Sequence, residues 1–143
     1  MEQVGYLKTM TREEFLLDML EYYCVDPFNR RCASYDDGQC KYYPTHEGTE
    51  GCAIGRHLSP ELAKKLDRYT SSYTSASIDQ VDITLLPNKL RLLGIEFLAN
   101  VQNLHDTAEF WEEKGLSLRG KKYISVQMIE NYNLDIAKFK KFL

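Results

Sequence analysis

One cysteine and one histidine of this chain have the chemistry needed for thiol catalysis. Cys52 lies in the turn Gly51-Cys52-Ala53-Ile54-Gly55, and His105 lies in a later segment of helical periodicity. A histidine that deprotonates a thiol produces the thiolate, which is the nucleophilic form of cysteine. We interpret the neighbouring Asp106 as a helix N-cap and not as a carboxylate that orients the imidazole. Catalysis by Cys52 and His105 is therefore our alternative interpretation, and a non-catalytic role is favoured.

The same residue types do not have the spacing of a metal site. The four cysteines are Cys24, Cys32, Cys40 and Cys52, and no two of them form a C-x₂₋₄-C pair. Such pairs allow a single turn to present two thiolates to zinc. The three histidines show no i, i+4 pair either. We predict no metal and no cofactor, and the state of Cys40 and Cys52 (free, bridged or metal-bound) stays open.

Arginine and tyrosine side chains near two glycine-flanked turns favour binding of an anion. Arginine pairs with phosphate through two hydrogen bonds, tyrosine stacks on a base, and backbone N–H groups at a glycine turn can approach an anion closely. The alternative is a solvated network in which Arg31 and Arg56 pair with acidic residues between positions 36 and 50. The candidate ligand-binding residues are Arg31, Tyr42, Cys52, Gly55, Arg56 and His105.

The elements that must position these residues are mostly helices. Thr11 and Glu14 form a capping box at the start of a helix over 11–24, which should end before Pro27. Residues 25–51 are rich in turn residues, and we predict a small antiparallel hairpin at about 39–54. Ser59 and Pro60 begin a second helix. Further helices are expected from residue 82 onward, including a short one from Asp106 to Gly115. The predicted fold is α+β, a mostly helical single domain over 1–143 with one hairpin.

Length and composition limit the possible functions. The chain has 143 residues, a net charge of −3, 43% hydrophobic residues and ten tyrosines. This size suits one domain with its own core. The negative charge argues against direct binding to nucleic acid. No apolar run approaches the ~20 residues that cross a bilayer, and the first residues lack a signal-peptide pattern. We therefore expect a cytoplasmic protein (host cytoplasm if it is encoded by a phage) that does not bind membranes.

Three short motifs resemble those of a family of small proteins encoded by phages and prophages. The motifs are Cys40-Lys41-Tyr42, then Cys52-Ala53-Ile54-Gly55, then Gln102-Asn103-Leu104-His105-Asp106 followed by Trp111. The resemblance covers about Arg31 to Trp111. The chain has Val101 before Gln102, where the family pattern has leucine, and its hairpin loop is longer and more acidic. The resemblance implies a phage accessory protein, and it implies no catalytic residue.

These observations lead to one functional hypothesis and two alternatives. We expect a phage-type counter-defence protein that binds and sequesters a phosphate-bearing, nucleotide-type small molecule without catalysis. The first alternative is direct inhibition of a host defence protein by this tyrosine-rich, acidic chain. The second is a cysteine-dependent enzyme acting on a small molecule. Either a monomer or a homo-oligomer is compatible with the sequence.

Overall fold

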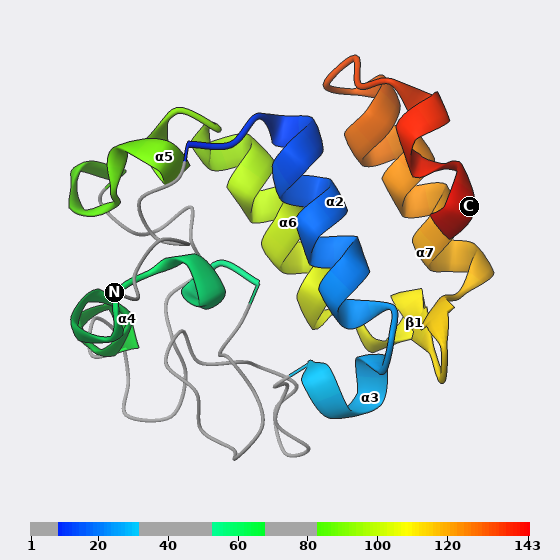
Figure 1. The fold of residues 1–143 in the computed structure, drawn as a ribbon, viewed down its shortest axis with the longest axis horizontal. Coiled ribbons are helices and arrows are strands. Elements are labelled where there is room, and N and C mark those ends of the chain that lie inside the picture. Colours follow the sequence, from blue (N-terminus) through cyan, green and yellow to red (C-terminus); the bar gives the residue numbers. More distant parts are fainter. Residues whose placement is uncertain (1–8, 32–52, 68–82) are drawn as a thin grey trace.

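Two helices that run in the same direction form the centre of the protein (Figure 1). The computed structural model describes residues 9–31, 53–67 and 83–143, and Figure 1 shows these two helices, α2 (Arg12–Tyr23) and α6 (Ile95–Asp106), side by side. Phe15 of α2 meets Phe97 of α6 edge to face, with ring centroids 6.2 Å apart. The buried apolar residues of the pair are Phe15, Leu16, Met19, Leu20, Tyr23, Phe97, Leu98, Val101 and Leu104. Their helical spacing on each segment is what makes the two helices amphipathic and drives them together.

The start of α2 has the local structure that the sequence predicts. Thr11 accepts a hydrogen bond from the Glu14 N–H, and Glu14 accepts one from the Thr11 N–H, which is a complete capping box. These two bonds satisfy two N–H groups that the first turn of a helix leaves without partners. After α2, Pro27 is the first residue of the short helix α3 (Pro27–Arg30). The predicted end of the first helix is therefore confirmed.

A second group of elements precedes α6. The turn η1 (Gly55–His57) leads into α4 (Pro60–Asp67), whose first turn is capped by Ser59 Oγ accepting from the Leu62 N–H at 3.2 Å. The turn η3 (Ile83–Leu85) and the short helix α5 (Asn88–Arg91) then lead to α6. Gly94 precedes α6 with a φ of 92°, a conformation that glycine adopts without a steric penalty. The capping role predicted for Ser59 is confirmed.

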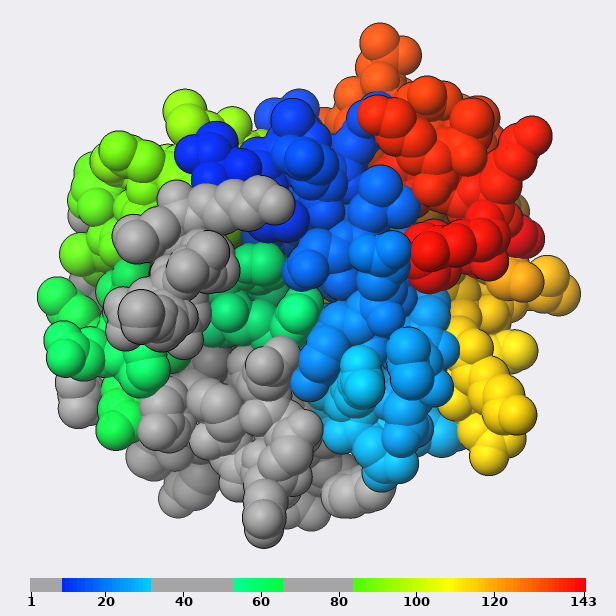
Figure 2. Space-filling view, in the orientation of Figure 1, coloured from blue at the N-terminus to red at the C-terminus, as the bar shows by residue number. Residues whose placement is uncertain are grey.

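The C-terminal third covers the other side of α2. It comprises η4 (Ala108–Phe110), strands β1 (Trp111–Glu112) and β2 (Gly115–Leu116), α7 (Leu118–Tyr123), the π-helical turn η5 (Ile124–Glu130) and η6 (Ile136–Phe142). In the space-filling view of Figure 2, α2 crosses the middle of the visible face, with the C-terminal residues on one side and residues 53–65 on the other. Phe139 and Met128 are fully buried and belong to the same core.

The observed antiparallel pair does not lie where the sequence predicts the hairpin. Trp111 pairs with Leu116 and Glu112 with Gly115, in a segment for which we predicted a helix. Gly115 has a φ of 151°, and the buried Trp111 donates a 2.8 Å hydrogen bond to the Leu104 carbonyl. These two features favour a tight reversal of the chain over a helix. The helix predicted from Asp106 to Gly115 is therefore wrong.

The predicted hairpin at 39–54 lies outside the described residues except for its last two positions. Ala53 and Ile54 form a buried turn, and Ile54 has helical backbone angles, so the predicted extended run does not continue through them. The fold class itself, α+β and mostly helical with a small antiparallel pair, is confirmed. Among the described segments, no helix has both the length and the apolar character required to cross a membrane.

Candidate functional site

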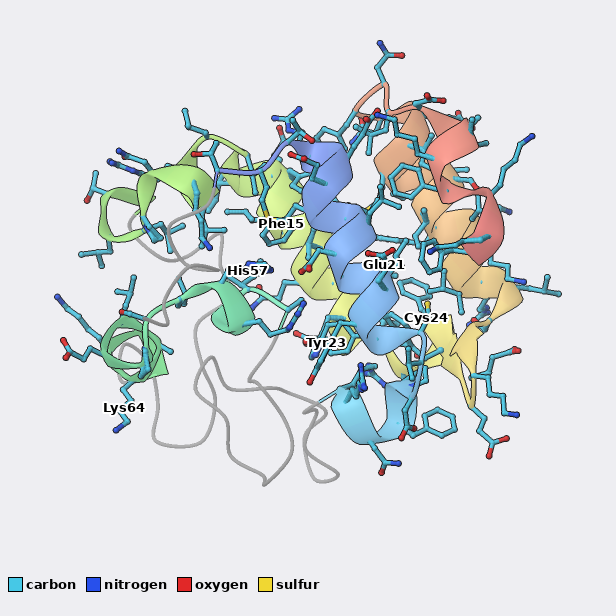
Figure 3. The ribbon with its side chains drawn as sticks, viewed as in Figure 1. Phe15, Glu21, Tyr23, Cys24, His57 and Lys64 are labelled. Atoms are coloured by element: carbon cyan, nitrogen blue, oxygen red, sulfur yellow. The ribbon has the colours of Figure 1, made fainter. Side chains whose placement is uncertain are left out.

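Four of the six predicted ligand-binding residues are described, and they gather around one end of α2. They are Arg31, Gly55, Arg56 and His105, whereas Tyr42 and Cys52 lie outside the described residues. Tyr23 of α2 connects them: its ring centroid is 4.9 Å from that of His105 and 5.7 Å from the guanidinium carbon of Arg56. Figure 3 shows Tyr23 and His57 on one side of α2, and Glu21 and Cys24 on the side facing the C-terminal residues.

Arg56 lies where η1 meets α2. Its Nη1 donates to Asp18 Oδ2 at 3.0 Å, and its guanidinium lies over the ring of Tyr22 at 4.0 Å from the centroid. The adjacent His57 places Nε2 3.3 Å from the same Asp18 oxygen, without hydrogen-bond alignment. Arg56 and Asp18 have side-chain exposures of 13% and 36%. Asp18, which a helical-wheel argument assigns to solvent, is therefore a shared partner of two residues of η1.

The pKa values around Asp18 are shifted by burial and by these contacts. The contact with His57 lowers the pKa of Asp18. Partial burial opposes this shift, and Arg56 reinforces it. Burial lowers the pKa of His57, and Asp18 opposes this shift only in part. Burial also lowers the pKa of Lys89, an α5 residue with 5% of its surface exposed, to about 8. The carboxylate of Asp18 thus interacts with Arg56, His57 and Lys89.

A second guanidinium converges on Tyr22. Arg30, at the end of α3, lies over the Tyr22 ring at 4.6 Å from its centroid and donates from Nη1 to the Tyr22 carbonyl at 2.9 Å. No carboxylate among the described residues forms an ion pair with Arg30. The ring of Tyr22 therefore holds two guanidinium groups from segments far apart in the sequence, Arg30 and Arg56.

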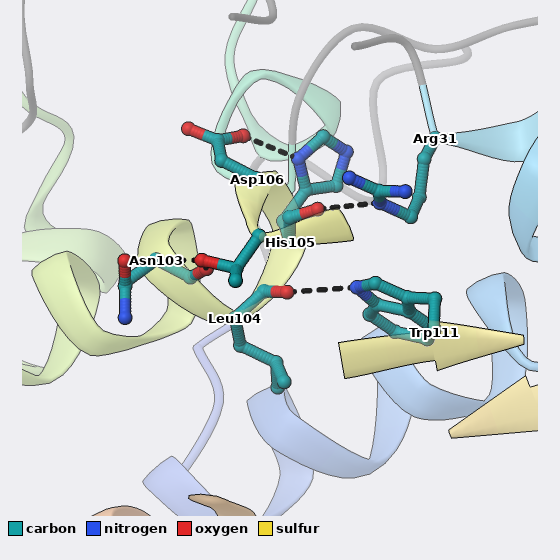
Figure 4. Close-up of polar contacts among 7 residues, drawn as sticks. Arg31, Asn103, Leu104, His105, Asp106 and Trp111 are labelled. Atoms are coloured by element: carbon teal, nitrogen blue, oxygen red, sulfur yellow. Dashed lines mark hydrogen bonds and ion pairs between the residues drawn. The ribbon is translucent and has the colours of Figure 1, made fainter. Parts of the chain in front are cut away.

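Arg31 is a half-buried cation next to His105 and Trp111. Its Nε donates to the His105 carbonyl at 2.5 Å, and its guanidinium lies over the Trp111 ring at 5.8 Å from the centroid (Figure 4). Burial lowers the pKa of Arg31, and the charge of Asp106 opposes that shift. Within the described parts of the chain, no carboxylate comes within ion-pair distance of Arg31. A half-buried positive charge without a paired carboxylate is an electrostatically favourable place for an anion.

His105 and Asp106 form a hydrogen-bonded pair. Nδ1 of His105 lies 2.7 Å from Asp106 Oδ1, and His105 is fully buried while Asp106 is partly exposed. Asp106 is the last residue of α6, and Thr107 is the cap of the following turn. The interpretation of Asp106 as an N-cap is therefore wrong. Adjacent residues normally diverge on a helix, but at a helix end the side chain of the last residue can turn back to its neighbour.

A surface depression of about 430 Å³ lies between α2 and the C-terminal residues. It is lined by Glu21, Cys24, Val25, Lys141 and Phe142, on the side of α2 that faces away from Tyr23 (Figure 3). Burial raises the pKa of the Cys24 thiol to about 11, so this cysteine is a poor nucleophile at neutral pH. Across residues 9–31, 53–67 and 83–143, no three histidine, cysteine or acidic side chains come together as a metal site would require.

Comparison with known proteins gives no relative that would identify this site. No family model, no curated protein and no solved structure matches the chain. The residues of the cluster and the motifs described above are therefore the basis for inferring a function.

Sequence reasoning missed several members of this cluster. Tyr22 and Tyr23 follow the periodicity of a core helix, and nothing in that periodicity separates a core tyrosine from one that holds arginines. Lys89 lies in a short leucine-rich segment where a lysine usually points to solvent. The sequence does contain one signal for this cluster, the pair Arg30-Arg31 shortly after Pro27. Two consecutive side chains cannot both lie on the same face of a helix, so the pair indicates that the two arginines have different partners.

Proposed function

We propose that this protein binds and sequesters a phosphate-bearing, nucleotide-type small molecule at the arginine–tyrosine cluster beside α2. The supporting observation is Arg31, a half-buried guanidinium that has no ion-paired carboxylate among the described residues. Burial of a cation costs free energy, and a bound anion would offset that cost. Of the side-chain N–H groups of Arg31, the described residues accept only from Nε, through the His105 carbonyl.

The surroundings of Arg31 suit the two chemical parts of a nucleotide. Arg30 lies at the end of α3, and its guanidinium lies over the Tyr22 ring, as does that of Arg56. Asp106 is the described carboxylate whose charge acts on Arg31, and it does not form an ion pair with it. Trp111 and Tyr22 supply aromatic rings, on which a base or a guanidinium can stack. Guanidinium groups beside aromatic rings are typical of phosphate and nucleotide recognition.

The biological role that we propose is phage counter-defence. The support for this role is the resemblance of the motifs around Cys52, His105 and Trp111 to small proteins of phages and prophages. That support is an association with a genetic context and not a physical derivation. A phage protein that removes a host-made nucleotide signal needs tight binding and no chemical step.

The decisive experiment identifies what leaves the purified protein on heating. Mass spectrometry of the released fraction should show an intact phosphate-bearing molecule. When a panel of nucleotides is added one at a time, those of the same chemical class as this molecule should raise the melting temperature of the protein. Arg31→Lys keeps the charge but removes the planar fork, and it should lose at least about tenfold in affinity. Arg119→Lys is the matched control, because Arg119 is exposed on α7 and should leave binding unchanged. Recovery of a host protein without any small molecule would instead support direct inhibition.

One observation favours a second function, that of a cysteine-dependent enzyme. The 2.7 Å contact between His105 Nδ1 and Asp106 Oδ1 is the arrangement in which a carboxylate orients a catalytic imidazole. Cys52 would be the nucleophile. The heating experiment separates the two functions, because an enzyme would release a chemically altered molecule. Cys52→Ser should abolish turnover by an enzyme and should leave sequestration of the intact ligand in place.

A further inference from the structure

The second ring nitrogen of His105 is a buried polar atom without a hydrogen-bond partner. Nε2 is inaccessible to solvent, and none of the described residues donates to it or accepts from it. A buried polar atom left unsatisfied costs about 1–3 kcal/mol. In proteins such atoms are matched by an ordered water, an ion or a ligand, or they take part in a chemical step.

Asp106 determines the kind of partner that Nε2 needs. The Asp106 carboxylate lies 2.7 Å from Nδ1, and because an ionised carboxylate only accepts, this contact assigns the ring proton to Nδ1. In neutral imidazole one nitrogen carries the proton and the other offers a lone pair. With the proton on Nδ1, Nε2 is an acceptor and must be matched by a hydrogen-bond donor.

Arg31 lies on the same side of the His105 imidazole ring as Nε2, and its terminal N–H groups need hydrogen-bond acceptors. In Figure 4, Nε2 lies on the edge of the imidazole that is turned toward Arg31 and away from Asp106. Arg31 donates to the His105 carbonyl through Nε, and its terminal N–H groups lack acceptors among the described residues. The ring of Tyr23 lies 4.9 Å from the His105 ring, and the ring of Trp111 lies 5.8 Å from the Arg31 guanidinium carbon. Donors without acceptors therefore lie next to an acceptor without a donor.

We propose that this site selects an anion that also carries a hydrogen-bond donor, with Arg31 binding the negative oxygens and His105 Nε2 accepting from the donor. The inference rests on the proposed function and narrows it. A phosphate with a retained proton, or a phosphate ester with an adjacent hydroxyl group, satisfies both residues. A fully deprotonated anion of the same size satisfies Arg31 and leaves Nε2 unpaired.

Inorganic phosphate and sulfate are the probes that separate these cases. At mildly alkaline pH both are tetrahedral dianions, but phosphate retains one proton and sulfate retains none. Calorimetric titrations at constant ionic strength should give at least about tenfold tighter binding of phosphate, because sulfate leaves a buried acceptor unsatisfied. In ¹⁵N spectra of the imidazole rings, phosphate should shift the unprotonated Nε2 signal of His105, and sulfate should leave that signal in place.

Three variants assign the preference for phosphate to His105 and the binding of both anions to Arg31. His105→Gln retains a side-chain oxygen that can accept and should keep part of the preference for phosphate, whereas His105→Phe should abolish the preference and still bind both anions. Arg31→Lys should weaken both anions by a similar factor and keep their ratio. Circular dichroism confirms that each variant is folded, and the ¹⁵N titration of the unaltered protein gives the answer even if His105→Phe does not fold.

Each result has a distinct consequence. Equal affinity for phosphate and sulfate in the unaltered protein would overturn the inference about His105 and leave anion binding intact. Failure of both anions to bind, together with no effect of Arg31→Lys on any nucleotide, would overturn the proposed function and the inference with it.

Discussion

The carboxylate of Asp18 lies 3.0 Å from Arg56 Nη1 and so connects α2 to the turn η1. This contact holds Arg56 over the ring of Tyr22. The same turn also meets α2 through the ring contact of His57 with Phe15, whose centroids are 4.5 Å apart. The pair of Asp18 and Arg56 is thus both a structural contact and a constraint on the direction of a proposed ligand-binding residue.

A double-mutant cycle measures this contact. Asp18→Asn and Arg56→Gln should together give a coupling energy of about 1 kcal/mol, because both side chains are partly shielded from water. Urea denaturation of the four proteins provides the free energies of unfolding. The matched control is the pair Glu21 and Lys141, whose side chains are 58% and 65% exposed and whose coupling should be close to zero. Equal coupling in the two cycles would contradict the role assigned to Asp18.

Lys89 should make the free energy of unfolding depend on pH in the alkaline range. Its pKa is about 8 in the folded state and 10.5 in the unfolded chain. At a pH between these two values the unfolded state therefore binds more protons. Stability therefore rises with pH across this window. The burial of Cys24 acts in the opposite direction, because a thiol pKa raised from 9.0 to about 11 removes stability as the pH rises.

The two effects are separated by Lys89→Met. The free energy of unfolding of the unaltered protein minus that of the variant should rise by about 1–3 kcal/mol between the two pKa values of Lys89, because the Cys24 contribution cancels in the difference. Lys65→Met, on an exposed position of α4, is the control and should give a flat difference. A flat difference for Lys89→Met would mean that its amine is solvated in the folded protein.

Gly120 should not tolerate a side chain. A Cβ atom at this position of α7 would fall onto the backbone carbonyl of Phe110 and come within 3.1 Å of Leu116 Cδ2. Because backbone atoms cannot move aside as a flexible side chain can, Gly120→Ala should destabilise the protein by about 2–4 kcal/mol despite the higher helix propensity of alanine. Lys122→Ala in the same helix, at an exposed position, should change the stability by less than about 0.5 kcal/mol. Thermal unfolding of both variants tests this close approach of α7 to η4.

The helices were readable from the sequence because their signals are local. The capping box of Thr11 and Glu14, the stop before Pro27 and the Ser59 cap each depend on residues within a few positions of one another. The helix predicted around Trp111 does not form, although Asp106 and Glu109 have the spacing of a capping box. The conformation there depends on the hydrogen bond from Trp111 to Leu104 and on the close approach of Gly120 to Phe110, and neither partnership follows from spacing.

The sequence by itself determined the helical class, the helix starts and the presence of arginines near glycine-flanked turns. Only the tertiary structure decided which groups those arginines meet: Asp18 and Tyr22 for Arg56, and the His105 carbonyl and Trp111 for Arg31. It also decided that Asp106 turns back to His105 and leaves Nε2 without a partner among the described residues. The physical reason is that caps and periodicity are properties of consecutive residues, whereas burial and pairing of a charge depend on segments that are distant in sequence and adjacent only in the fold.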